Sequence, residues 1–258
     1  MPDKLQEILA QFESVSLKEM ESVKLMNRTD TKYTFNASVL NELLDSLKND
    51  YKVLDIEGKR QCTYKTLYYD TDNLSLYLEH HNGHLNRYKI RHRTYIDSGA
   101  GFLEVKLKNN KGRTIKERIK RKVTPFEWEK ETGDFLTEKT SFDPNTLKPT
   151  LWVNYKRITL VSKKNPERVT IDVKLEFDDN TNSQTVDDLV IAELKQDSKI
   201  PSVFHTKMKE MRIKEGSISK YCLGIAMVKP GVKINNFKEK LRAIKNLLYG
   251  GEFNIAGS

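Results

Sequence analysis

The sequence predicts an α+β fold in which an eight-stranded antiparallel β tunnel or barrel has helices packed on its outside. Segments with alternating apolar and polar residues follow one another closely, tight turn sequences separate them, and amphipathic helical segments flank them. Strands at such short spacing pair antiparallel, because a parallel connection needs a crossover of a dozen or more residues. We expect one domain over 1–258, with 1–25 an N-terminal helix and 235–258 a C-terminal helix and tail.

The chain begins with predicted helices on either side of a first strand. Apolar residues recur at helical spacing over 4–24, which predicts a helix. The segment "NRTDTKYTF" reads as a strand, and Asn36 or Ser38 can cap the helix that follows it. One face of that helix carries Val39, Leu40, Leu43, Leu44 and Leu47.

Seven further strands are predicted in the middle of the chain, from their Val, Ile, Thr and Tyr content and their period of two. They are "CTYKTLYYDT", "NRYKIRHRTY", "GFLEVKLKN", "RTIKERIKR", "LWVNYKRITLV", "RVTIDVKLEF" and "LVIAELKQ". The turn sequences "DSGAG", "NNKG", "KKNPE" and "DDNTNS" separate several of them. Short helices are expected near 74–79, 125–132, 206–214, 219–228 and 237–248.

One face of each of three consecutive predicted strands carries almost only basic residues. They are Arg87, Lys89, Arg91, Arg93, Lys106, Lys108, Lys116, Arg118 and Lys120, and Glu104 is the one acid on that side. A solvent-exposed sheet face also alternates, but like charges opposite each other destabilise a sheet. The helices also need the apolar strand faces to dock on. We therefore expect the charged faces to line a wet interior that binds a polyanion, with arginine forks and lysine point charges on phosphate.

The composition limits the classes of function. The formal net charge of +9 favours anionic partners. The cations are not interleaved with aromatic stacking platforms, so no nucleic-acid partner is expected. Cys62 and Cys222 are isolated, which disfavours a zinc site and suits a reducing cytoplasm. With no signal peptide and no membrane span in the sequence, we expect a cytoplasmic protein. The "HHNGH" histidines are interpreted as surface residues.

The ordered set "NRTDTKY", "YKIRHR", "GFLEVKLKNNKGRTIKERI", "NYKRITL", "VTIDVKLEF", "IAELK" and "SISKY" resembles the VTC-type polyphosphate polymerase domain of the triphosphate tunnel metalloenzyme (CYTH-like) superfamily. The resemblance covers about 26–227. It implies an enzyme that transfers the γ-phosphoryl group of ATP to inorganic polyphosphate, with Mn²⁺ or Mg²⁺ as cofactor. It also implies which residues take part in phosphoryl transfer and which bind the metal ion.

The catalytic set that follows from the matched motifs is Arg91, Arg93, Lys106, Lys116, Arg157 and Lys220. The phosphate- and nucleotide-binding set is Arg28, Lys32, Arg118 and Lys195, to which the shared strand face adds Arg87, Lys89 and Lys108. Glu193 takes the place of the family's metal-binding glutamate, and Glu104 on the inner face is a second candidate ligand.

Two other functions stay open on the same residues. The hydrolytic tunnel enzymes begin with E-x-E-x-K, and the first strand here, "NRTDTKY", has no such pair of glutamates. That difference favours a polymerase over a tunnel-fold triphosphatase. A non-catalytic protein that binds polyphosphate or nucleotide would use the same basic residues. The sequence does not predict the length of the polyphosphate product, the physiological metal or the oligomeric state.

Overall fold

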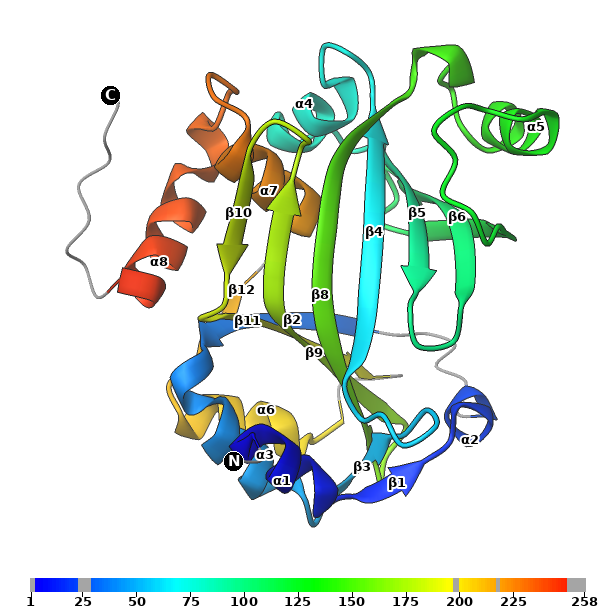
Figure 1. Cartoon of the computed structure of the whole chain (residues 1–258). Coiled ribbons are helices and arrows are strands. Elements are labelled where there is room, and N and C mark those ends of the chain that lie inside the picture. Colours follow the sequence, from blue (N-terminus) through cyan, green and yellow to red (C-terminus); the bar gives the residue numbers. More distant parts are fainter. Residues whose placement is uncertain (1–2, 23–28, 197–199, 217–218, 250–258) are drawn as a thin grey trace.

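The computed structural model describes residues 3–22, 29–196, 200–216 and 219–249. One curved sheet of twelve strands dominates it, and nine of them follow the order β12-β2-β11-β9-β8-β4-β5-β6-β7 (Figure 1). The strands are β1 (Glu13–Val15), β2 (Thr29–Asn36), β3 (Tyr51–Leu54), β4 (Cys62–Asp70), β5 (Arg87–Tyr95), β6 (Ala100–Lys108), β7 (Thr114–Lys120), β8 (Lys148–Ser162), β9 (Glu167–Asp178), β10 (Ser183–Val186), β11 (Leu189–Gln196) and β12 (Glu215–Gly216).

Helices lie at both ends of the strands and along one side of the sheet (Figure 1). The α-helices are α1 (Lys4–Ala10), α2 (Leu17–Ser22), α3 (Leu40–Leu47), α4 (Ser75–His81), α5 (Lys130–Lys139), α6 (Val203–Glu210), α7 (Lys220–Val228) and α8 (Lys238–Tyr249). Three 3₁₀ turns accompany them, η1 (Ala37–Val39), η2 (Pro144–Thr146) and η3 (Asn235–Phe237). Within the described part of the chain, no helix is long and apolar enough to cross a membrane.

The convex face of the sheet carries two apolar cores. Helices α1, α3 and α6 cover one of them, where Tyr33 and Phe35 of β2 meet the buried leucines of α3. Asn36 caps the 3₁₀ turn η1 that leads into α3, because its Oδ1 accepts a hydrogen bond from the Ser38 amide at 2.9 Å. The predicted cap on α3 itself is wrong, since its N-cap is Val39, which forms no side-chain cap hydrogen bond. The second core lies outside β4, β5 and β6, and both tryptophans, Trp128 and Trp152, pack against it.

The eight predicted strands are confirmed as β2, β4 to β9 and β11, and the α+β class holds. The predicted count of eight is too low, because β1, β3, β10 and β12 have only two to four residues each and show little alternation. Every pairing in the sheet is antiparallel except that of β1 with β3.

The single N-terminal helix expected over 1–25 is wrong. Helix α1 ends at Ala10, and Glu13–Val15 leaves the helical path to pair with β3. A new helix, α2, begins after Ser16. Its start is a capping box, since the Ser16 amide donates to Glu19 Oε2 at 2.9 Å and the Glu19 amide donates to Ser16 Oγ at 3.3 Å.

One helix does not pack on the outside. Helix α7 lies against the concave face, where five consecutive residues from Tyr221 to Ile225 are buried among side chains of β4, β8, β9 and β11. The close approach requires a glycine at Gly224, because a Cβ there would lie 2.5 Å from Phe177 Cδ1 and 2.6 Å from Leu151 Cδ2. The part of the interior around α7 is therefore apolar and filled.

The uninterrupted alternation predicted for "RVTIDVKLEF" is also wrong. Lys174 has a φ of +52°, and the pairing of β8 with β9 shifts register next to it. This bulge turns Leu175 and Phe177 to the concave face, whereas Val169 and Ile171 face the convex core. Before the bulge, β9 presents polar residues to the interior; after it, apolar ones.

Candidate functional site

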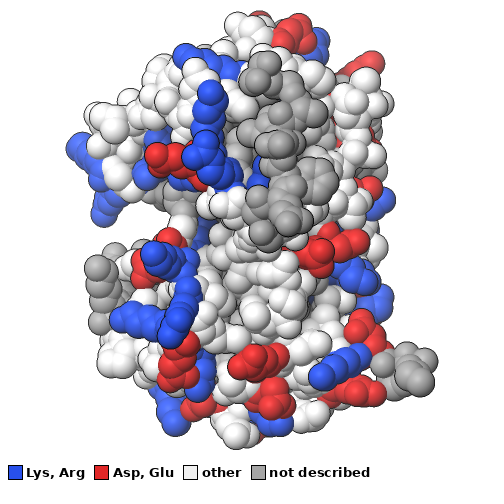
Figure 2. All heavy atoms as spheres, turned by 90° about the vertical axis from the view of Figure 1, so that its left-hand side faces the viewer, with Lys and Arg blue, Asp and Glu red and all other residues white. Residues whose placement is uncertain are grey.

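A cavity of about 1220 Å³ lies beside the part of the interior that α7 fills, with Ser219, Cys222 and Leu223 among its lining residues. The two ends of the sheet face each other across it, since β2 and β12 line one side and β5, β6 and β7 the other. Among the described residues, β7 does not pair with β2 or β12 to close the sheet into a ring. Figure 2 shows Lys and Arg side chains around a hollow on this side of the molecule. Seven predicted site residues line the cavity, namely Lys32, Arg87, Lys89, Lys106, Lys108, Lys116 and Glu193.

Strand register stacks the cations of β5, β6 and β7 in rows. Arg87 is opposite Lys108, and Lys106 lies between Lys89 and Lys116. Successive rows are about 7 Å apart, two residues along a strand. Rows of like charge are unfavourable in a folded sheet unless an anion lies against them.

The next row contains the carboxylate of Glu104, which is 1% exposed. Its Oε2 lies 2.7 Å from Arg91 Nε and its Oε1 2.6 Å from Lys116 Nζ. Burial alone would raise the pKa of Glu104, but the charges of Arg91, Arg93 and Lys116 outweigh burial and hold that pKa well below its usual range. Arg91 also donates to the Tyr68 hydroxyl at 3.1 Å. Glu104 thus fixes two of the predicted cations.

A second buried carboxylate, Asp172, was not predicted as a site residue. Arg157 donates to both of its oxygens, at 2.6 and 2.8 Å, and Lys220 Nζ lies 2.5 Å from Oδ2. Burial would raise the pKa of Asp172, and these two cations instead hold it well below normal. Asp172 shares a sheet face with Thr170 and the basic Arg168, and this alternation was the available signal in the sequence.

Tyrosines of β4 and β8 support the arginines on the inner wall. The guanidinium of Arg157 lies 4.9 Å from the ring centre of Tyr64 and 5.3 Å from that of Tyr155. Arg93 lies 5.6 Å from the ring centre of Tyr64. The two rings stack 5.2 Å apart. Cation–π contact holds each guanidinium while leaving hydrogen-bond donors for an anion.

Glu193 is the acidic residue that lines the cavity from β11. Its Oε2 lies 3.2 Å from Lys195 Nζ. Burial would raise the pKa of Glu193, but Lys195, Lys32 and further cations lower it to about 2, so the carboxylate is ionised. No group of three or more His, Cys, Asp or Glu side chains capable of holding a metal exists among the described residues. Glu193 could supply one oxygen ligand, and a bound phosphate would have to supply others.

Several buried lysines in and near the cavity have a lowered pKa. Burial and the neighbouring cations Lys106, Lys32 and Arg91 lower the pKa of Lys89 to about 7. Burial lowers the pKa of Lys116 and of Lys195 to about 8 despite their carboxylate partners. A bound anion would raise the pKa of each of these lysines and favour its charged form.

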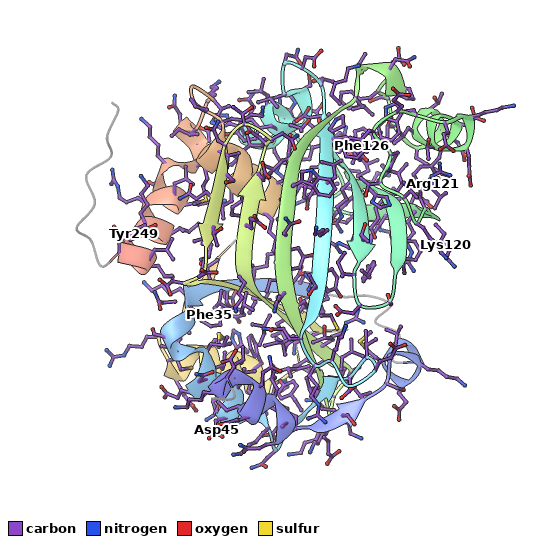
Figure 3. The ribbon with its side chains drawn as sticks, in the orientation of Figure 1. Phe35, Asp45, Lys120, Arg121, Phe126 and Tyr249 are labelled. Carbon is purple, nitrogen blue, oxygen red and sulfur yellow. The ribbon has the colours of Figure 1, made fainter. Side chains whose placement is uncertain are left out.

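Not every predicted residue lines the cavity. The buried Arg91, Arg93, Glu104, Arg157, Lys195 and Lys220 are not among the described residues that line it. Arg118 packs over the Phe102 ring at 4.5 Å on the exposed strand β7 and is not among the described residues that line the cavity. Figure 3 places Lys120 and Arg121, beyond it, on the opposite side of the molecule from Tyr249 at the end of α8. Arg28 lies outside the described residues.

The prediction that the "HHNGH" histidines lie on the surface is wrong for two of them. His80 lines the cavity, and His81 is 2% exposed. The Asn236 amide donates to His81 Nε2 at 3.2 Å, which ties α4 to η3. These interactions depend on how α4 packs against the C-terminal segment. Short sequence patterns cannot predict that packing, because the two segments are far apart in the chain.

Residues 27–229 match the VTC domain family. Similar solved structures include a candidate adenylate cyclase from Bacillus halodurans, with 14% identity, a TM-score of 0.49, and coverage of 82% of this chain and 99% of that one. Another is a Hippeastrum protein described as having a dominant triphosphatase activity, with 13% identity, a TM-score of 0.48, and coverage of 80% and 98%. No curated protein matches. By the family match, which covers most of its length, this chain belongs to the VTC domain family.

Proposed function

We propose that this protein is a polyphosphate polymerase, which transfers the γ-phosphoryl group of ATP to the end of an inorganic polyphosphate chain. The observation that carries the proposal is the cavity that cations from β2, β5, β6 and β7 line together. Membership of the VTC domain family supports it. A cavity with this charge suits a ligand that carries many negative charges in a row.

The reaction needs no activated side-chain nucleophile. A terminal phosphate oxygen of the acceptor chain bonds to the γ-phosphorus of ATP. The bond from that phosphorus to the bridging oxygen breaks, and ADP leaves with the electron pair. Catalysis then consists of aligning two phosphate groups and neutralising their charge. Arg91, Arg93 and Arg157 are the groups suited to this, because guanidinium forks match phosphate oxygens.

The buried carboxylates position these cations before substrate binds. Glu104 orients Arg91, and Asp172 orients Arg157 and Lys220. Pre-oriented donors contribute more to catalysis than mobile ones, because they need not reorganise as charge develops. Glu104 is engaged by two cations, which leaves Glu193 as the better candidate for a metal ligand. When bound, Mn²⁺ or Mg²⁺ would help to neutralise the phosphate oxygens.

The test is incubation of the full chain with ATP and Mn²⁺ or Mg²⁺, followed by gel analysis for long-chain polyphosphate. Polymer supports the proposal. Orthophosphate without polymer would indicate a triphosphatase, and ligand binding with neither product a binding protein; both would overturn the polymerase proposal. Arg93→Ala should lose polymer formation, whereas Lys209→Ala, an exposed lysine on α6, should retain it.

A separate variant tests whether Glu193 binds a metal ion. Glu193→Ala should abolish turnover yet still bind tripolyphosphate, because the cations that contact phosphate remain. Isothermal titration calorimetry with tripolyphosphate in the absence of divalent ions measures the second quantity. Full turnover in this variant would exclude a metal-binding role for Glu193.

A further inference from the structure

One wall of the cavity is apolar. Leu223 of α7 lies there with Phe237 of η3 and with Leu241 and Ile244 of α8. The lysines of β5 and β6 line the same cavity. Phosphate groups gain nothing from apolar surface, so the phosphate-binding function proposed above leaves this wall without a role.

We propose that this wall is the binding subsite for the nucleobase of the donor nucleotide, with the triphosphate directed toward the lysine rows of β5 and β6. The inference rests on the proposed function, since it assumes that a nucleoside triphosphate enters the cavity. A nucleobase is flat and largely apolar on its faces, and ligand sites typically bury such rings against hydrophobic and aromatic side chains.

The wall is held in place from several directions. The Phe237 ring packs edge-on against Tyr77 at 6.0 Å and against His81 at 5.1 Å. Asn36 of β2 donates to the Leu247 carbonyl at 3.1 Å, which anchors α8 to the sheet. Ile244 is 5% exposed and joins the core around α7. A pre-formed apolar surface binds a base without the entropic cost of ordering it.

Polar groups lie next to this wall. His80, Ser219, Cys222 and Lys240 line the cavity beside it. Burial, together with the charges of Lys89 and Arg87, lowers the pKa of His80 to about 2, so its imidazole is neutral. Because the wall is mostly apolar, we expect it to hold the base chiefly by burial and to distinguish little between ATP and GTP. It should distinguish both from tripolyphosphate, which has no base.

The experiment compares ATP with tripolyphosphate on the full chain, by isothermal titration calorimetry without divalent ions. Leu241→Ala should raise the Kd for ATP by about 5- to 10-fold, because it removes apolar surface from the base subsite. Its Kd for tripolyphosphate should stay unchanged. Leu241→Trp, which fills the subsite, should weaken ATP binding by more and again spare tripolyphosphate.

The matched control is Leu248→Ala. Leu248 lies on the same helix and packs against the same core, but it is not among the residues that line the cavity. This variant should leave both Kd values unchanged. An equal loss for ATP and tripolyphosphate in the Leu241 variants would overturn the subsite, and so would unchanged ATP binding. Wild-type protein that binds neither ligand would overturn the proposed function together with this inference.

Discussion

Two groups of cations on the inner side of the sheet differ in how their charge is balanced. The paired cations, Arg91, Arg157 and Lys220, contact the buried carboxylates Glu104 and Asp172. The row lysines, Lys89 and Lys106, form no ion pair with a described residue, and burial lowers the pKa of both. The carboxylates hold the paired cations in a fixed orientation. An anion bound beside the row lysines would raise their pKa and favour their charged form.

The largest difference between the two groups is expected when a buried carboxylate is removed. Asp172→Ala would leave Arg157 and Lys220 buried without their partner, and we expect a loss of about 3–5 kcal/mol in the free energy of unfolding. Denaturant unfolding measures it. Lys106→Met, which removes a row lysine, should cost little or raise stability. Equal losses in the two variants would show that the two groups are not different.

A smaller effect is expected from exchanging a paired arginine for lysine. Arg91→Lys keeps the charge but loses the guanidinium fork that reaches both Glu104 and Tyr68. Tripolyphosphate binding should weaken by about 10- to 100-fold, the equivalent of one charged hydrogen bond. Calorimetric titration tests this, with Lys209→Arg on the exposed face of α6 as control. Unchanged affinity in Arg91→Lys would mean that charge alone matters there.

The lowered pKa of Lys89 predicts that anion binding depends on pH. Lys89 has a pKa of about 7 in the empty cavity, and a bound polyanion raises it. Binding should therefore take up protons near neutral pH, and affinity should fall as pH rises above 7, where the empty protein has lost the proton. Titration in two buffers with different ionisation enthalpies measures the uptake. Lys89→Met should reduce it, and an unchanged uptake would contradict the assignment.

The smallest predicted effect concerns the bulge that separates the polar and apolar parts of β9. Lys174 has a φ of +52° and an exposed side chain. Lys174→Gly should relieve left-handed strain and stabilise the fold by about 1 kcal/mol. Thermal unfolding would detect it. Lys174→Val should destabilise, because a β-branched residue resists this conformation, and the opposite order would show that the bulge is not strained.

The inner face of β5 and β6 could be predicted from the sequence because no bulge interrupts either strand, so the period of two runs from Arg87 to Arg93 and from Glu104 to Lys108. The same reasoning failed on β9, where one residue with positive φ reverses the faces. Asp172 was missed because its role depends on Arg157, fifteen residues away across a strand pair. The position of α7 inside the sheet depends on long-range packing at Gly224, which the local sequence pattern does not show.

The aromatic residues are divided between the two faces of the sheet. Tyr64 and Tyr155 contact the inner arginines, whereas Trp128 and Trp152 pack against the convex core. The intrinsic chromophores therefore report on different places. Tryptophan fluorescence follows the integrity of the outer core, and the part of the tyrosine ultraviolet difference spectrum that comes from Tyr64 and Tyr155 follows the inner arginines. An anion that draws Arg157 away from its two rings changes the tyrosine spectrum and leaves the tryptophan emission constant, so occupancy and unfolding are separable without a label.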